Sequence, residues 1–339
     1  MRTTPDFSID HEQLSPVRKF LDKRGLDLPP IPVDMQEDWS LPFMRWVVDQ
    51  TTDGMECRLQ QDDHPGIVIG THRDIVCDPA LYNLARVEAG RPTTHIVLGS
   101  NLARQDWVRR IMEANKALFI DRSLTGKAAL KQQIRLSKEV ASIVRNEGHV
   151  WIAQAPGRAK NGWDETHSGL LRMLALDWGG EELGPVALDG LLRPLAIRYA
   201  YNPCDGLLIE EKIRGSKKEQ DDERSMLMGL EGWKGKIRMS EGQAISTEHM
   251  DKEAGWNGLA KEIDRQMDRL VEFSSWAVAA RSALHEAGTA SLPMGMQERA
   301  RSLQEAHQDT LGTLSEDSLF RHMCEVYREG SRQGLVTSD

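Results

Sequence analysis

A regular alternation of short apolar runs and longer helical stretches, between residues 65 and 245, most constrains the fold of this chain. The runs are three to five residues long and rich in β-branched residues, which is typical of buried strands. Strands separated by helices form a sheet whose faces are covered by those helices. We therefore predict an α/β fold, with a mixed sheet flanked by helices. The predicted strands are Gly66–Gly70, Thr94–Leu98, Leu118–Ile120, Val150–Gln154, Leu195–Tyr199 and Lys236–Met239.

The pattern of elements divides the chain into three parts. Residues 1–60 are predicted to be irregular with short helices, one of them over about Leu41–Asp49. Residues 61–248 hold every predicted strand and form the α/β domain. Residues 249–339 have no strand pattern and form a helical C-terminal extension, in which Trp256–His285 reads as one long amphipathic helix. Further helices are predicted over Asp78–Ala89, Leu102–Asn115, Gly126–Asn146, Trp163–Trp178, Met294–Leu311 and Glu316–Gln333.

Net charge, cysteine spacing and the lengths of apolar runs exclude several classes of protein. A net charge of −9 over 339 residues argues against a nucleic-acid binder, which usually has a basic excess. The four cysteines form no C-x-x-C pair, so free thiols in a reducing cytoplasm are expected, and no cluster has metal-ligand spacing. The N-terminus lacks the apolar core of a secretory signal, and no run reaches the ~20 apolar residues of a membrane span. We therefore expect a cytoplasmic protein without a metal, whose contact with the inner face of a membrane would be peripheral.

A polar turn, GTHRDIVCD, follows the first predicted strand. His72 can act as a general base there if a carboxylate fixes its tautomer, and Asp74 and Asp78 are the local candidates. The alternative is that Asp78 caps the helix beginning near Pro79 and that His72 is a turn residue, and these residues alone favour that alternative. Cys77 is interpreted as a small buried thiol rather than a nucleophile.

Cationic side chains follow two further predicted strands. Arg122 ends the run Leu118–Ile120 and Lys127 begins the next helix, whereas Arg158 and Lys160 follow the strand that ends near Gln154. Arginine recognises phosphate through paired hydrogen bonds and lysine acts as a point charge. Each cation alone is typical of a solvated surface. Because ligands bind at the carboxyl ends of strands in open α/β sheets, the set together predicts an anion site beside a general base.

Taken in order, these blocks resemble the glycerolipid acyltransferase family, which comprises glycerol-3-phosphate and 1-acylglycerol-3-phosphate acyltransferases. The resemblance extends over roughly residues 65–245 and implies transfer of an acyl group from acyl-CoA or acyl-carrier protein to a hydroxyl. No cofactor besides the acyl thioester and no metal is implied. The partners implied are a phosphorylated glycerol or lysophospholipid and a membrane surface. The four blocks are His72 to Asp78, Leu118 to Arg122, Val150 to Lys160 and Leu192 to Tyr199.

The resemblance also implies roles for single residues. His72 would deprotonate the acceptor hydroxyl, which then attacks the thioester carbonyl directly. An aspartate of the first block would orient His72; we favour Asp78, because Asp74 is close along the chain and less able to reach the far ring nitrogen. The residues expected to hold the substrate are Arg73, Arg122, Lys127, Gly157, Arg158 and Lys160.

Two departures from the family pattern bear on the acceptor and on activity. The first block is His-x5-Asp rather than His-x4-Asp, which leaves open whether Asp74 or Asp78 is the partner of His72, and Pro156 stands where the third block has a glutamate. Two alternatives follow: the same fold with a different acceptor, such as a lyso-aminolipid, or a non-catalytic protein that binds acyl groups or lipid. The segment Gly215–Gly235 is interpreted as a charged loop and a short helix on the sheet, with an amphipathic membrane contact as its alternative.

Overall fold

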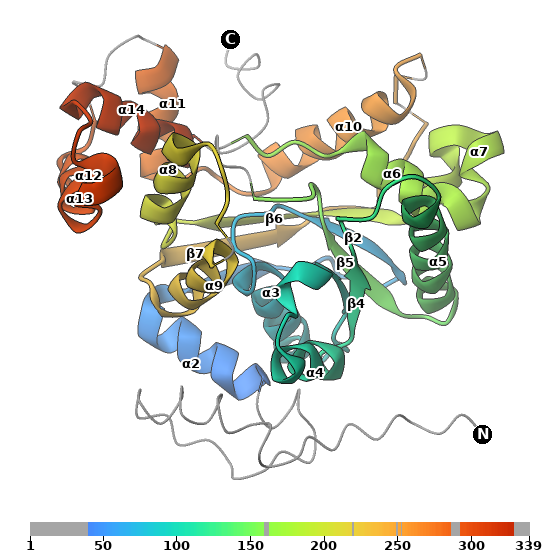
Figure 1. The fold of residues 1–339 in the computed structure, drawn as a ribbon. Coiled ribbons are helices and arrows are strands. Elements are labelled where there is room, and N and C mark those ends of the chain that lie inside the picture. The colour runs from blue at the N-terminus through green and yellow to red at the C-terminus, as the bar shows by residue number, and fades with distance from the viewer. Residues whose placement is uncertain are drawn as a thin grey trace.

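A computed structural model describes residues 40–158, 163–218, 220–248, 250–251, 253–285 and 292–328. Within these residues, seven strands form one sheet with helices on both faces (Figure 1). The predicted fold class is confirmed. The strands are β1 (Thr52–Arg58), β2 (Gly66–Gly70), β3 (His95–Gly99), β4 (Ala117–Ile120), β5 (His149–Ala153), β6 (Leu192–Tyr199) and β7 (Gly235–Glu241).

The helices lie mostly between the strands and after the last strand. The α-helices are α2 (Leu41–Thr51), α3 (Cys77–Glu88), α4 (Asp106–Ala114), α5 (Gly126–Arg145), α6 (Ser168–Ala175), α7 (Gly180–Leu183), α8 (Asp205–Arg214), α9 (Asp221–Glu231), α10 (Gly255–Leu270), α11 (Ser275–His285), α12 (Met294–Ala306), α13 (Gln308–Leu311) and α14 (Glu316–Tyr327). Three short 3-10 helices, η2 (Ser100–Leu102), η3 (Leu176–Trp178) and η4 (Gly184–Leu188), complete the set.

The sheet is mixed, in the order β1-β7-β6-β2-β5-β3-β4. The block from β6 to β4 is parallel, whereas β7 runs antiparallel to β6 and β1 pairs parallel to β7. Gly70, the last residue of β2, pairs with Ala153 of β5 and Leu195 of β6. The loops after β2, β3, β4 and β5 therefore leave the sheet at one edge, which is where ligand-binding groups gather in such folds.

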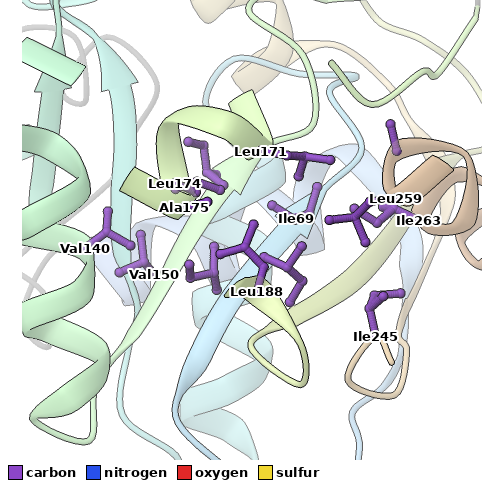
Figure 2. Packing of buried hydrophobic residues seen from close by; sticks show 14 of the residues in the cluster. Ile69, Val140, Val150, Leu171, Leu174, Ala175, Leu188, Ile245, Leu259 and Ile263 are labelled. Atoms are coloured by element: carbon purple, nitrogen blue, oxygen red, sulfur yellow. The ribbon is translucent and has the colours of Figure 1, made fainter. Parts of the chain in front are cut away.

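Alternate residues of β2 contact opposite faces of the sheet. Ile67 and Ile69 belong to an apolar cluster with α5, α6 and α10, and Figure 2 shows Ile69 among Leu171 of α6 and Leu259 and Ile263 of α10. Val68 belongs to the cluster on the other face, which α2 and α3 cover. Burial on both faces explains why the strand reads as the continuous apolar run GIVIG.

The C-terminal helices form a third apolar cluster. Residues of α11, α12 and α14 pack together with Leu208 and Ile209 of α8, and these helices lie together on one side of the molecule (Figure 1). In contrast, α10 packs on the sheet, and β1 lies in the sheet although it precedes residue 61. The sheet and its covering helices thus include residues before 61 and after 248. The predicted domain boundaries stay predictions.

The predicted single helix Trp256–His285 is wrong, because the chain forms α10 and α11 with a break between them. Val271 is extended, and its carbonyl accepts a hydrogen bond from Arg198 Nε at 3.2 Å. Ser274 Oγ accepts from the N–H of Ala277 at 3.1 Å, which satisfies a donor that the first turn of α11 leaves free.

The predicted helix Trp163–Trp178 is also too long, since α6 begins at Ser168. The preceding residues are held outside a helix by distant partners. Thr166 N–H and Oγ1–H both donate to Asp264 Oδ1 of α10, at 2.8 and 2.6 Å. In the part of the chain that is described, no helix has the length and apolar character that crossing a membrane requires.

Candidate active site

His72 and Asp78 meet at the carboxyl end of β2. The side chain of His72 is 14% exposed, and its Nδ1 lies 3.9 Å from Oδ2 of Asp78, which is fully buried. Nδ1 is buried and has no hydrogen-bond partner among the described residues. Catalytic hydrogen bonds are often long before substrate binds, so this spacing suits a base and its orienting carboxylate. The imidazole is thus partly open to solvent on one side and faces a carboxylate on the other.

Three donors hold the carboxylate of Asp78. Oδ2 accepts the backbone N–H groups of Arg73 at 2.7 Å and Asp74 at 2.9 Å, and Oδ1 accepts the hydroxyl of Tyr199 at 2.7 Å. Burial raises the pKa of Tyr199 well above its ordinary value, and the charge of Asp78 adds to the effect, so this phenol stays protonated and donates. A buried carboxylate needs such partners. Tyr199 therefore fixes Asp78 from the neighbouring strand β6.

Asp74 has a different role from Asp78. Its Oδ1 accepts the N–H groups of Val76 at 2.8 Å and Cys77 at 2.7 Å, where α3 begins. Burial, and then the charge of Asp78, raise the pKa of Asp74. Of the two candidate carboxylates, Asp78 is the one within ion-pair distance of His72. Asp74 therefore accepts the free N–H groups at the start of α3. On the sequence alone, this capping role was considered for Asp78.

The thiol of Cys77 is fully buried and donates to the carbonyl of Gly229 in α9 at 3.3 Å. Burial raises its pKa well above the ordinary value, and the carboxylate of Asp74 adds to this. The thiol therefore stays protonated, as expected of a packing residue and not of a nucleophile.

Arg73 points into the protein. Its guanidinium is 4% exposed and pairs with Asp164, which lies after the third motif block. Asp164 also lies 4.0 Å from Arg198 of β6. The structure thus places Arg73 in a buried charge cluster, and its predicted contact with substrate stays a prediction.

The cations of the second and third blocks lie close to each other. Arg122, after β4, donates through Nη1 to the carbonyl of Pro156 in the loop after β5. Arg158 of the same loop donates through Nη2 to Ser225 Oγ of α9 at 2.8 Å. Its Nη1 is buried and makes no hydrogen bond within the described residues. Two strand ends therefore bring two guanidinium groups to one edge of the sheet, as expected.

The remaining predicted residues are less constrained. Lys127 is exposed on the first turn of α5, and Gly157 is exposed in the loop after β5. Lys160 lies outside the described residues. Within those residues, no group of histidine, cysteine and carboxylate side chains is arranged to hold a metal ion.

Sequence reasoning missed several residues that shape the site. Tyr199 was recognised as part of the fourth block but was given no role, and Asp164 was not singled out. Ser225 and Gly229 lay in the segment Gly215–Gly235, interpreted as a charged loop and a short helix, and that short helix is α9, Asp221–Glu231. Their spacing along a helix was visible, but the partners that face them lie far away in the chain.

Comparison with known proteins gives a family match and a similar solved structure. Residues 53–178 match the family described as Acyltransferase. The structure of the 1-acyl-sn-glycerophosphate (LPA) acyltransferase PlsC from Thermotoga maritima is similar to this chain with 12% identity and a TM-score of 0.41, over 69% of this chain and 77% of that one. No curated protein matches the sequence. The matched segment holds the first three motif blocks, so the family match confirms the predicted resemblance over residues 53–178.

Proposed function

We propose that the protein transfers a fatty acyl group from acyl-CoA or acyl-carrier protein to the hydroxyl of glycerol 3-phosphate or a lysophospholipid. The observation that carries this proposal is the placement of His72 beside Asp78, a buried carboxylate that three donors hold at the carboxyl end of β2. No further cofactor and no metal is part of the proposal. Lysophospholipids lie in membranes, so the proposal includes peripheral contact with the inner face of one.

The geometry supports direct acyl transfer. The exposed side of His72 accepts the proton of the acceptor hydroxyl, while the oxygen attacks the thioester carbonyl carbon. Asp78 stabilises the imidazolium through the Nδ1–H that faces it. The tetrahedral intermediate then expels the thiolate, which takes the proton back from the imidazolium. The acyl group has moved from sulfur to oxygen, and His72 returns to its starting state.

The two guanidinium groups support a phosphorylated acceptor. Arg158 keeps donors of its Nη1 without a hydrogen bond in the described structure, and Arg122, after β4, reaches the loop of Arg158 through its bond to the Pro156 carbonyl. Guanidinium groups bind phosphate oxygens through paired hydrogen bonds. We propose that this pair holds the acceptor phosphate while His72 acts on the hydroxyl, which fixes the orientation of the two reacting groups.

A second acceptor class, a lyso-aminolipid without a phosphate, is favoured by one observation. Pro156 replaces the glutamate of the family pattern, and its backbone carbonyl, rather than a carboxylate, accepts the hydrogen bond from Arg122. The two acceptor classes predict different effects of Arg158→Ala on the KM of the acceptor. A phosphorylated acceptor requires a rise of roughly tenfold or more in its KM, whereas a phosphate-free acceptor requires almost none.

The test is release of CoA from a long-chain acyl-CoA by the purified protein, with lysophosphatidic acid, glycerol 3-phosphate or no acceptor. CoA is quantified by chromatography, because free thiols such as the half-buried Cys57 would react with thiol reagents. We expect acceptor-dependent release that His72→Ala abolishes while the melting temperature is kept. Folded protein that transfers no acyl group from acyl-CoA or acyl-carrier protein to either acceptor refutes the proposed function.

A further inference from the structure

We propose that α9 is a positioning helix for the active site: Ser225 orients the phosphate-binding group of Arg158, and Gly229 seats Asp74 of the first block. The inference rests on the proposed function, because it gives the helix a role in that same site. It is carried by contacts of α9 with the first and third motif blocks and with the turn after β3.

The contacting residues share one face of the helix. Asp222, Ser225 and Gly229 are three and four residues apart, which places them on the same side of an α-helix. All three are buried, whereas Leu227 and Met228 between them are 38% and 39% exposed. The buried face thus points toward the carboxyl edge of the sheet, and the outer face is left to solvent.

Ser225 fixes the guanidinium of Arg158. The side chain of Ser225 is almost fully buried, and its Oγ accepts from Arg158 Nη2 at 2.8 Å. The carbonyl of Ser225 accepts from the buried thiol of Cys204 at 3.4 Å, so its backbone is also held. Because the guanidinium is planar, fixing Nη2 also sets the direction of the Nη1 donors, which lack a partner in the described structure. Ser225 therefore sets the direction of the Nη1 donors, which under the proposed function bind the substrate phosphate.

Gly229 is the one position on this face where a side chain does not fit. A Cβ there would lie 2.8 Å from Asp74 Cγ, which is closer than real contacts allow. Glycine in the middle of a helix destabilises it relative to alanine, so a contact must explain its presence. Here the carboxylate of Asp74 lies directly against the helix backbone while it accepts the N–H groups of Val76 and Cys77.

Asp222 holds the start of α9 against the turn after β3. Its Oδ2 accepts from Asn101 Nδ2, in the turn after β3, at 2.9 Å. Its Oδ1 pairs with Lys217. One helix face therefore contacts the turn after β3, the loop after β5 and the turn that carries His72.

The kinetic test compares Ser225→Ala with wild type. We expect KM for lysophosphatidic acid or glycerol 3-phosphate to rise roughly tenfold, the effect of losing one hydrogen bond to a charged group. kcat and KM for acyl-CoA should stay within about twofold, because uniform binding of the acceptor alone is weakened. Ser225→Thr keeps the hydroxyl and should restore most of the acceptor affinity. Leu227→Ala, on the outer face of the same helix, is the matched control and should behave as wild type.

Gly229→Ala tests whether the close contact between Gly229 and the Asp74 carboxylate positions Asp74. The methyl group displaces Asp74, and with it the backbone N–H groups that hold Asp78, so kcat should fall roughly tenfold or more although alanine favours the helix. Amide hydrogen exchange over residues 73–77 should become faster, and this measurement does not depend on activity.

The outcomes separate the two proposals. Wild-type enzyme without acceptor-dependent transfer refutes the proposed function, and exchange at residues 73–77 in Gly229→Ala then decides whether α9 seats the first block. With active wild type, an unchanged acceptor KM in Ser225→Ala overturns the inference. A parallel loss of kcat, both KM values and melting temperature in Ser225→Ala also overturns it, because that result shows only a structural role.

Discussion

Replacing Asp78 by asparagine tests the charge beside His72 while the shape of the side chain is kept. Asp78 Oδ2 lies 3.9 Å from His72 Nδ1. At an effective dielectric constant of about 20, an imidazolium and a carboxylate at that distance attract each other by about 4 kcal/mol. Each ~1.4 kcal/mol of barrier is a factor of ten in rate. We therefore expect kcat to fall roughly 1,000-fold in Asp78→Asn.

The variant should fold as the wild type does. The amide oxygen can accept the N–H groups of Arg73 and Asp74 that Oδ2 accepts now, and the amide nitrogen can donate to the hydroxyl oxygen of Tyr199. Thermal unfolding followed by circular dichroism checks this point, and acceptor-dependent CoA release measures kcat. The loss should therefore appear in the rate and not in the melting temperature.

Asp74→Asn is the comparison for this prediction. It keeps the oxygen that accepts from Val76 and Cys77, and Asp74 is not the carboxylate in ion-pair contact with His72, so its loss of kcat should be much smaller. The reasoning is refuted if folded Asp78→Asn keeps more than about a tenth of the wild-type kcat, or if Asp74→Asn loses more than Asp78→Asn does.

Three further predictions concern groups that support the site. Tyr199→Phe removes one hydrogen bond to the Asp78 carboxylate and should lower the free energy of unfolding by about 1.5–3 kcal/mol, measured by urea unfolding; no change would contradict the contact. Burial raises the pKa of Asp264 to about 7 from 3.8, so the folded state holds its proton longer than the unfolded chain. The free energy of unfolding should fall by up to about 4 kcal/mol as pH rises from about 4 to about 7, and Asp264→Asn should remove that dependence. The same pH dependence of the unfolding free energy in both proteins would contradict this prediction. In Gly70→Ala, the new Cβ would lie 2.8 Å from Trp151 Cε2, and a loss of about 1–3 kcal/mol in denaturant unfolding is expected, whereas wild-type stability would show that the ring moves freely.

The sequence predicted the strands well where burial alone decides the residue types. GIVIG contacts apolar clusters on both faces, so its apolar run marked β2 without ambiguity. In contrast, only Thr52 of β1 is buried, and the other positions of the sequence TDGMECR are half-buried or exposed, so the segment has no strong strand pattern. The break between α10 and α11 depends on the bond from Arg198 to Val271, a contact between distant segments that periodicity does not contain.

In the candidate site, too, local features could be predicted and contacts between distant segments could not. His72 and Asp78 are six positions apart; the residues alone favoured a capping role for Asp78, and their pairing was expected from the resemblance to the acyltransferase family. The engagement of Arg73 with Asp164 joins residues 91 positions apart and was not visible in the sequence. The contacts of α9 are of the same long-range kind. Residue types at strand ends therefore predicted which groups gather, whereas their final partners depended on tertiary packing.

The position of β6 in the sheet has a consequence for the order in which the site forms during synthesis. β6 pairs directly with β2, and Cys77 contacts Gly229 across 152 positions of sequence. A ribosome that has synthesised the segment 53–178 has already produced His72 and Asp78, yet Tyr199 and α9 do not exist at that point. Contacts of such long range carry a high loop-closure cost and form late. The nascent chain should therefore lack the complete site around His72 until residues beyond β7 have emerged.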